Sequence, residues 1–282
     1  MKKNSVAISS SYKTQLSDSY YMSIQMRLDG LSFSVLDPVN NAVLAIGNAD
    51  FGIVDEMFSR HEEFVLKEEI FKSNFKSVIV SIESRSFSMV PKALFEMEHA
   101  ADILRFIGCH ISKDDKVLAN NIEMVGGVLV FAVPNFLYYF LQTQYSDVRV
   151  LHQTEPIMQA ALLKRDNDKK KAVMHTVFSS DGVTIVIVEQ NKLKLCNKFK
   201  YKEVNDLVYI IIYTLEQMGL NNDSTKIVMS GDIEIGDARI ELVKRFAHNV
   251  SVAQLPDYFS YDVRIPEPEH KYVNLLNLNI CV

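Results

Sequence analysis

Two Asp-Gly pairs in this chain of 282 residues have the residue types that could hold a magnesium-bound phosphate. Asp29-Gly30 lies in RLDGLSFSVL (27–36), and Asp181-Gly182 lies in SSDGVTIVIV (179–188). An aspartate can organise Mg²⁺ or its water shell, and a glycine lets backbone N–H groups approach phosphate oxygens. Hydroxyl groups add hydrogen-bond donors without bulk. They follow both pairs, at Ser32, Ser34 and Thr184.

A tight turn is the competing interpretation of both pairs. Asp-Gly between two strands is the preferred pair of a two-residue type I′ hairpin turn, because both turn positions need a positive φ. A loop of two residues is too short to surround a phosphate, and Leu31 and Phe33 add bulk beside the first pair. The hydroxyls also alternate with apolar residues, as they do on the exposed face of any strand. These features favour a turn over a phosphate loop.

Other catalytic chemistry has less support in the sequence. The motifs G-x-x-x-x-G-K-[ST], G-x-G-x-x-G and G-x-S-x-G are all missing. A two-metal nuclease with Asp29 on its first strand would need three or four converging carboxylates. The three cysteines and seven histidines have no metal-ligand spacing, so we expect no metal site. No catalytic residue is assigned.

Composition limits the class of protein. The residues are 48% hydrophobic and 23% charged, which is typical of a globular protein. A net charge of −5 disfavours nucleic acid as a partner. The most apolar stretch, residues 125–141, is interrupted by Pro134 and Asn135, so we predict no membrane span. Three widely spaced cysteines and no secretory signal favour a reducing cytoplasm.

The elements that would position the Asp-Gly pairs follow one order twice. Alternation with a period of two predicts strands, and a period near 3.6 predicts helices. In the first half we expect strands at 21–28, 31–37, 42–47 and 77–84, with a helix at 49–66. In the second half we expect strands at 172–180, 183–189, 193–199 and 225–232, with a helix at 207–218.

The later helix carries further expectations. Asn205 or Asp206 is a suitable N-cap and Gly219 a suitable left-handed C-cap. Because the helix is apolar on nearly all sides, we expect it to be deeply buried. Between the two halves we expect strands at 125–134 and 147–153, and helices at 135–146 and 154–165.

The two halves keep a common register, which indicates a duplicated β-β-β-α-β unit. Asp29 and Asp181 are 152 residues apart, and so are Asp37 and Glu189, the acidic ends of the second strands. The charged stretch DNDKKK (166–171) is the natural boundary. We therefore predict a polar N-terminal segment at 1–20, a first lobe at 21–166 and a second lobe at 167–282.

Tandem units that each open with a hairpin resemble the actin-like ATPase superfamily. The resemblance implies an α/β actin-like ATPase fold, with two ribonuclease-H-like lobes and an interlobe cleft. The segment KIVMSGDIEIGD (226–237) resembles the part of that fold that contacts adenosine. Residues 128–162 resemble the crossing segment of the pilus-assembly actin-like proteins. More narrowly, RLDGLSFSVLD is similar to the opening of an uncharacterised Bacteroidetes family with this fold and no assigned function.

The resemblance implies ATP and Mg²⁺ as cofactors, but the hairpins depart from the pattern of the superfamily. That pattern is Asp-x-Gly with further glycines, whereas here Asp and Gly are adjacent. The favoured hypothesis is therefore a non-catalytic binding or scaffold protein with a degenerate nucleotide site. The alternative is an ATP- and Mg²⁺-binding ATPase that uses the cleft. In that case the nucleotide-binding residues would be Asp29, Gly30, Ser32, Asp181, Gly182, Thr184, Ser230, Gly231 and Asp232. Superfamily members often work through partners, so a protein partner or self-association is also expected.

Overall fold

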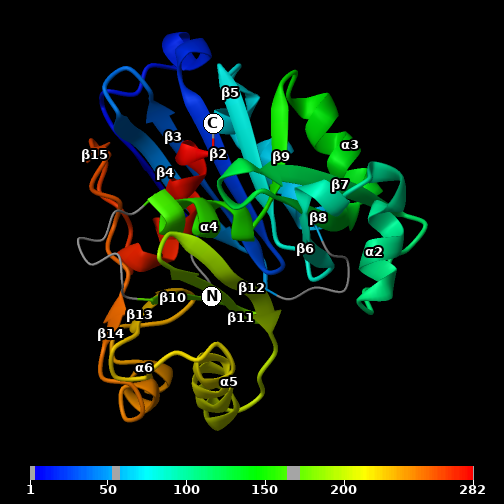
Figure 1. Ribbon diagram of the computed structural model, residues 1–282. Helices are drawn as coiled ribbons and strands as arrows, with labels where there is room; N and C mark the ends of the chain where they lie inside the picture. The colour runs from blue at the N-terminus through cyan, green and yellow to red at the C-terminus, as the bar shows by residue number, and fades with distance from the viewer. Residues whose placement is uncertain (1–3, 53–57, 164–171, 282) are drawn as a thin grey trace. The chain divides into compact units, whose positions relative to one another are not determined.

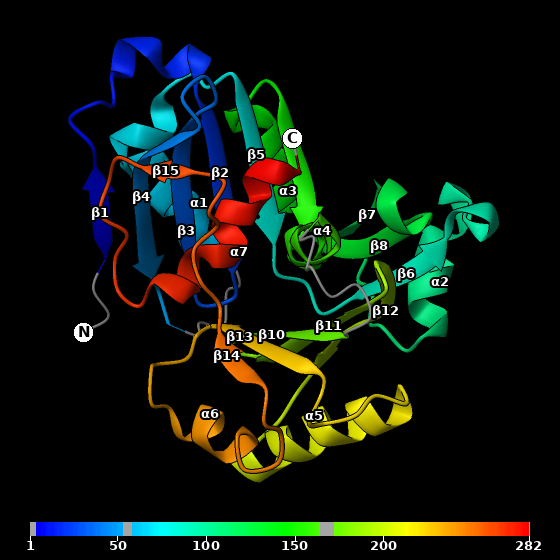
Figure 2. The same cartoon turned by 60° about the vertical axis from the view of Figure 1, so that its left-hand side comes forward.

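The computed structural model describes residues 4–52, 58–163 and 172–281. The chain forms two compact units (Figures 1 and 2). The first unit contains residues 1–155, 256–266 and 278–282, and the second contains residues 156–255 and 267–277. Each unit therefore includes a segment from the C-terminal part of the chain. Among the described residues, no helix is both long enough and apolar enough to cross a membrane.

The main sheet of the first unit is mixed. Its strands follow the order β1-β4-β3-β2-β5-β9, and β15 pairs with β4. The hairpin strands β2, β3 and β4 are antiparallel, whereas β5 runs parallel to β2 and β9 parallel to β5. The bounds are β1 (Ser5–Ile8), β2 (Tyr21–Arg27), β3 (Gly30–Asp37), β4 (Ala42–Asp50), β5 (Ser77–Ile82), β9 (Val148–His152) and β15 (Ser260–Tyr261). The first unit also contains helices α1 (Ser59–Lys67) and α3 (Asn135–Gln144), and the chain passes into the second unit at residue 156, within α4 (Thr154–Leu163).

A smaller antiparallel sheet lies within the sequence of the first unit, in the order β6-β8-β7. Its elements are β6 (Phe87–Pro91), α2 (Ala100–Phe106), β7 (Asp115–Ile122) and β8 (Gly127–Pro134). Buried residues of β8 and α2, among them Val130 and Leu104, form its core. The sequence predicted β8 alone of these elements.

The second unit has a five-stranded sheet in the order β12-β11-β10-β13-β14. The bounds are β10 (Val173–Ser179), β11 (Gly182–Glu189), β12 (Lys192–Phe199), β13 (Lys226–Gly231) and β14 (Val250–Val252). The helices are α5 (Val204–Gln217), α6 (Ala238–Val243) and the short α7 (Val273–Leu276). Both α5 and α6 lie on one face of this sheet (Figure 2). Fully buried side chains such as Leu207, Ile211 and Leu215 fill the space, each contributing about 1.5–3 kcal/mol through burial.

The two sheets share one topology, which agrees with the duplication seen in the sequence. In each, three antiparallel strands are followed by two parallel ones on the side of the first strand. Each second strand also has a shift in register, between Val35 and Leu36 in β3 and between Ile187 and Val188 in β11. These positions are again 152 residues apart. The fold is the α/β, two-lobed arrangement that was expected.

Two predictions about helices are corrected. The predicted helix at 49–66 begins only at Ser59, because Ala49 and Asp50 still pair with β3; residues 53–57 lie outside the described part. The predicted burial of α5 on all sides is wrong, because the helix covers a single sheet face. Its outer side exposes Tyr209 (66%) and Tyr213 (46%), whose rings stack at 5.4 Å.

The N-cap of α5 is Glu203, two residues before Asn205 and three before Asp206, which were the predicted caps. Asp206 is the reciprocal partner of Glu203 in a capping box. One oxygen of Asp206 accepts the N–H groups of Lys202 and Glu203 at 3.1 and 3.0 Å. These bonds hold the pKa of Asp206 below its ordinary value. At the other end, Gly219 has a φ of +68°, as predicted for a left-handed cap.

Candidate functional site

Each Asp-Gly pair lies at a two-residue hairpin turn, but the glycine is outside the turn. Arg27 pairs with Gly30, so the turn residues are Leu28 and Asp29; in the second unit Ser179 pairs with Gly182. None of these turn residues has a positive φ. The predicted type I′ turn at Asp-Gly is therefore wrong. That geometry occurs instead between β11 and β12, where Gln190 and Asn191 have φ values of 52° and 59°.

Both glycines are needed because the neighbouring strand comes very close. A Cβ atom on Gly30 would lie 2.2 Å from the carbonyl oxygen of Ala49 on β4. A Cβ atom on Gly182 would lie 2.2 Å from the carbonyl oxygen of Phe199 on β12, and Gly182 also has a φ of +136°. The same steric demand therefore recurs in both units. It is set by the third strand and not by a ligand.

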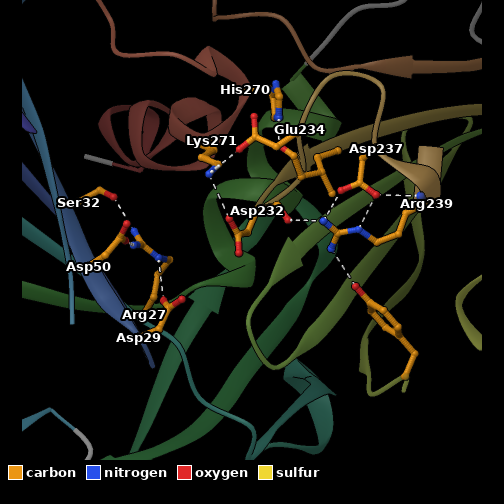
Figure 3. Close-up of polar contacts among 12 residues, drawn as sticks. Arg27, Asp29, Ser32, Asp50, Asp232, Glu234, Asp237, Arg239, His270 and Lys271 are labelled. Carbon is orange, nitrogen blue, oxygen red and sulfur yellow. Dashed lines mark hydrogen bonds and ion pairs between the residues drawn. The ribbon is translucent and has the colours of Figure 1, made fainter. Parts of the chain in front are cut away.

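One arginine, Arg27, is hydrogen-bonded to three polar side chains at the first hairpin. Arg27 donates from Nε to Asp29 Oδ1 at 3.3 Å, from Nη1 to Ser32 Oγ at 2.6 Å and from Nη2 to Asp50 Oδ1 at 2.9 Å (Figure 3). The planar guanidinium suits such simultaneous contacts. Asp29 and Ser32 are both buried. The carboxylate and hydroxyl that the sequence suggested for Mg²⁺ and phosphate are thus engaged by a cation of the same chain.

The backbone at this turn is also engaged. The N–H of Leu28 donates to Oε2 of the buried Glu83 at 3.1 Å. The carbonyl of Asp29 accepts the N–H groups of Phe51 and Gly52 at 2.7 and 3.2 Å. A phosphate-binding hairpin needs outward N–H groups to bind its ligand. Here the Leu28 N–H already serves a carboxylate.

His61 on α1 is hydrogen-bonded to the backbone of the same hairpin. Its Nε2 lies 2.8 Å from the carbonyl oxygen of Arg27 and 2.9 Å from that of Gly30, so this nitrogen carries the proton. The ring packs edge-on to Phe51 and beside Phe58. Burial lowers the pKa of His61 to about 4, because a charged imidazolium would lose its hydration there. His61 is therefore neutral at pH 7 and holds the hairpin as a donor.

The second hairpin repeats the pairing of acid with base. Lys198 Nζ lies 3.2 Å from Asp181 Oδ2, with side-chain exposures of only 6% and 10%. Thr184 lies opposite Lys198 in the register of β11 and β12 and is buried. Asp181 therefore pairs with a lysine of the neighbouring strand, whereas Arg27 is shared between Asp29 and Asp50.

The third predicted segment, Ser230-Gly231-Asp232, lies at the end of β13. Gly231 has a φ of +86°, and a Cβ there would lie 2.2 Å from the carbonyl oxygen of Phe178. The N–H of Asp232 donates to that same oxygen at 2.9 Å. Lys271 Nζ lies 3.1 Å from Asp232 Oδ1 (Figure 3). The structure thus brings Asp232 to a basic residue of the C-terminal segment.

Arg239 fixes the loop that follows. It is bonded to Asp237, to the hydroxyl of Tyr201 at 3.1 Å and to the carbonyl of Asp232 at 3.0 Å (Figure 3). Its guanidinium carbon lies 5.2 Å from the ring centre of Phe178. The pairing raises the pKa of Arg239 and lowers that of Asp237. This arginine is a fixed part of the loop.

A cavity of about 880 Å³ opens in the second unit beside the hairpin. It is lined by the hairpin tip, by the start of α5 and by the chain between β12 and α5. The lining residues that carry charge are Asp181, Lys200, Lys202, Asp206, Asp232 and Arg239. Within the described parts of the chain, no three His, Cys, Asp or Glu side chains gather in a way that could hold a metal ion.

Sequence reasoning found the aspartates but missed the residues that engage them. Arg27 stands two positions before Asp29, and this proximity was a usable signal. Lys198 gave no signal, because it meets Asp181 only through the pairing of β11 and β12. Asp50 and Glu83 likewise reach the hairpin through the sheet and not through sequence neighbourhood.

Similar solved structures show which fold this chain has. A Bacteroides thetaiotaomicron VPI-5482 protein with actin-like ATPase fold and unknown function matches with a TM-score of 0.79 and 20% identity, over 96% of this chain and 99% of its own. A PilM–PilN type IV pilus biogenesis complex matches with a TM-score of 0.65 and 10% identity, over 93% and 98%. This chain therefore has the actin-like ATPase fold.

The family follows from the sequence itself. Residues 9–250 match the model of the DUF3822 family, whose description is "Protein of unknown function". The chain belongs to this family. Among curated proteins, none matches the sequence. The resemblances expected from RLDGLSFSVLD and from residues 128–162 are thus confirmed at the level of family and fold.

Proposed function

We propose that this protein is a non-catalytic binding or scaffold protein of actin-like fold whose nucleotide site is degenerate. The observation that carries the proposal is the internal cation at each hairpin. Arg27 engages Asp29, and Lys198 engages Asp181. A divalent ion approaching either carboxylate would have to displace a positive charge that is covalently part of the chain.

The charges at the hairpins also support a degenerate nucleotide site. A carboxylate attracts Mg²⁺ through its net charge, and an adjacent guanidinium or ammonium group cancels that charge at short range. A triphosphate would further need the Ser32 hydroxyl and the turn N–H groups. Of these donors, the N–H of Leu28 already donates to Glu83.

A protein partner is the natural ligand for such a scaffold. The similar PilM structure is a complex with PilN, so at least one protein of this fold holds a protein partner. A fold can keep a binding surface while losing a catalytic site, because function resides in sites and not in the fold.

One observation favours the alternative of an ATP- and Mg²⁺-binding protein. The cavity of about 880 Å³ contains Asp181, Gly182 and Asp232, which were predicted nucleotide-binding residues. Lys200 and Lys202 on its wall would attract phosphate. This alternative requires that Asp181 exchange Lys198 for Mg²⁺.

Thermal unfolding with and without millimolar Mg²⁺-ATP separates the two functions. We expect an unchanged Tm and no phosphate release. A ligand at 100 times its Kd would stabilise the protein by about 2.7 kcal/mol, which raises Tm by several degrees. A Mg²⁺-dependent rise that disappears in Asp181→Asn, measured against that variant's own nucleotide-free Tm, would favour the ATPase.

A further inference from the structure

The sheet of the second unit ends in an unpaired edge. β12 is eight residues long and pairs with β11 on one side. No other strand of the described chain pairs with it. An edge strand presents backbone N–H and C=O groups to any strand that can approach. This edge is longer than β14, the three-residue strand at the opposite side.

The edge carries a concentrated positive charge. Residues 192–202 read KLKLCNKFKYK, with five lysines and no acidic residue. On the side of β11, Lys194 lies 3.1 Å from Glu189 and Lys198 lies 3.2 Å from Asp181. The remaining lysines are exposed, at positions 192, 200 and 202. In a chain with a net charge of −5, this is a local reversal of sign.

We propose that β12 accepts an extended acidic segment of a partner protein as an additional strand. The inference rests on the binding role proposed above and names the chemistry of the partner. Strand addition supplies backbone hydrogen bonds, and the side chains supply selectivity. Acidic residues on the incoming strand meet these lysines from the free side, as Glu189 meets Lys194 from the paired side.

The same charges exclude a second copy of the chain. Pairing β12 with another β12 sets lysines against lysines, and like charges on adjacent strands are destabilising. Lysine is a common means of keeping edge strands from pairing with their own kind. An acidic strand can still pair with this edge, because its charges are opposite to those of the lysines.

The cavity of the second unit lies next to the C-terminal end of β12, where one end of the added segment would be. Lys200, Tyr201 and Lys202 follow the last residue of β12 and line the cavity. Tyr209 and Ile210 form part of the same wall. A segment that runs along β12 therefore reaches a space with two lysines and apolar side chains, which suits a large terminal side chain beside an acidic group.

Two synthetic peptides of about eight residues, matched to the length of β12, test the proposal. One alternates Glu and Val, and the other alternates Glu and Pro. Their charge is the same, but proline has no N–H to give to a strand edge. We expect saturable fluorescence-anisotropy binding of the Glu–Val peptide alone, weakening as salt rises. Hydrogen exchange should slow in residues 192–199 on binding.

A charge-reversed variant locates the site. The triple variant Lys192→Glu, Lys194→Glu and Lys200→Glu changes exposed side chains, so the fold should persist. We expect at least about tenfold weaker binding of the Glu–Val peptide. The control is Lys244→Glu, at the residue that follows α6, also exposed and paired with a glutamate, which should leave binding within about twofold.

Several outcomes would overturn the inference: equal binding of the Glu–Pro peptide, displacement by an oligothymidylate, absence of exchange protection in β12, or a dimer lost in the triple variant. Mg²⁺-ATP is titrated on the same protein. Failure of the peptide alone contradicts the acidic-strand inference, whereas a nucleotide response alone contradicts the proposed function. The two failures are therefore distinguishable.

Discussion

At the scale of single residues, the aspartate of each hairpin forms an ion pair, but the cation differs between the two hairpins. Arg27 contacts three groups through its fork of N–H donors, whereas Lys198 acts as a point charge on Asp181. The glycines share a single steric cause, since each faces a carbonyl oxygen of the third strand. The duplicated feature is thus the packing of the hairpin, and the neutralising side chain differs between copies.

This packing predicts the effect of adding one methyl group. Gly30→Ala and Gly182→Ala should each lower the free energy of unfolding by at least about 2 kcal/mol, because the new Cβ meets a backbone oxygen that cannot move aside freely. Urea denaturation monitored by circular dichroism measures the change.

Gly219→Ala is the matched control. Gly219 also has a positive φ, but open space surrounds it, so the substitution should cost only about 1 kcal/mol. Equal losses at all three positions would contradict the close approach of the third strand as the reason for Gly30 and Gly182.

The sequence revealed the Asp-Gly pairs because they recur with a fixed offset. It did not reveal why the glycines are there, because Ala49 and Phe199 come close only after the third strand pairs. The assignment of a type I′ turn to the pair failed because each glycine lies one position outside the two-residue turn. At this scale, the sequence identifies residues whose side chains could bind a ligand, and the fold determines which of these side chains already contact other residues of the chain.

At the scale of elements, helix α1 and the first hairpin depend on each other through His61. The described residues provide no hydrogen-bond partner for its Nδ1, which faces an aromatic environment. Protonation would place a charge and an unpaired donor at this nitrogen. The Nε2–H would still donate to the two carbonyl oxygens, but the buried charge makes the protonated form unfavourable.

Acid should therefore weaken the protein before its carboxylates titrate. The pKa of His61 is about 4 in the folded state and about 6.5 when unfolded, so the unfolded state binds more protons between these values. The contribution of His61 is complete at pH 7 and declines as pH falls from 6.5 towards 4. Its total is on the order of 3 kcal/mol.

Urea unfolding at several pH values tests this sign. His61→Gln keeps a side-chain donor but does not titrate, so the difference in stability between the wild type and the variant should shrink as pH falls from 7 to 4.5. A difference that stays constant over this range would contradict the role given to His61.

Among the strands that the sequence predicted, β10 alternates between buried and partly exposed residues, whereas β2, β3 and β11 are buried on both faces. β2, β3, β10 and β11 follow clear hydrophobic patterns and carry the repeat. β7 was missed because nearly all its residues are partly exposed, which removes the alternation that marks a strand. The buried face of α5 was overestimated because tyrosines count as apolar in the pattern yet lie on its outer side.

At the scale of the whole molecule, the chain does not divide at a single point. It enters the second unit at residue 156, leaves it at 256, returns at 267 and leaves again at 278. The C-terminal residues are part of both cores: His270 donates to the carbonyl of Ile233 at 2.7 Å, and Ser23 donates to Asn279 at 3.0 Å. Local sequence patterns could not reveal these long-range returns.

A chain that ends after Pro266 should therefore be destabilised in both units. The truncation removes residues 267–277 from the second unit and 278–281 from the first, exposing apolar surface in each. Hydrogen exchange should accelerate in both β2 and β13. A peptide of residues 267–282, added back, should restore protection; acceleration in only one strand would contradict the shared role.

The division of the C-terminal residues between the two units affects folding during synthesis. Synthesis proceeds from the N-terminus, and domains usually fold as they leave the ribosome. Here the first unit contains residues 278–281, so this unit cannot be completed before those residues are synthesised. The apolar surface that the C-terminal residues cover stays exposed until then, and such exposure favours aggregation of incomplete chains.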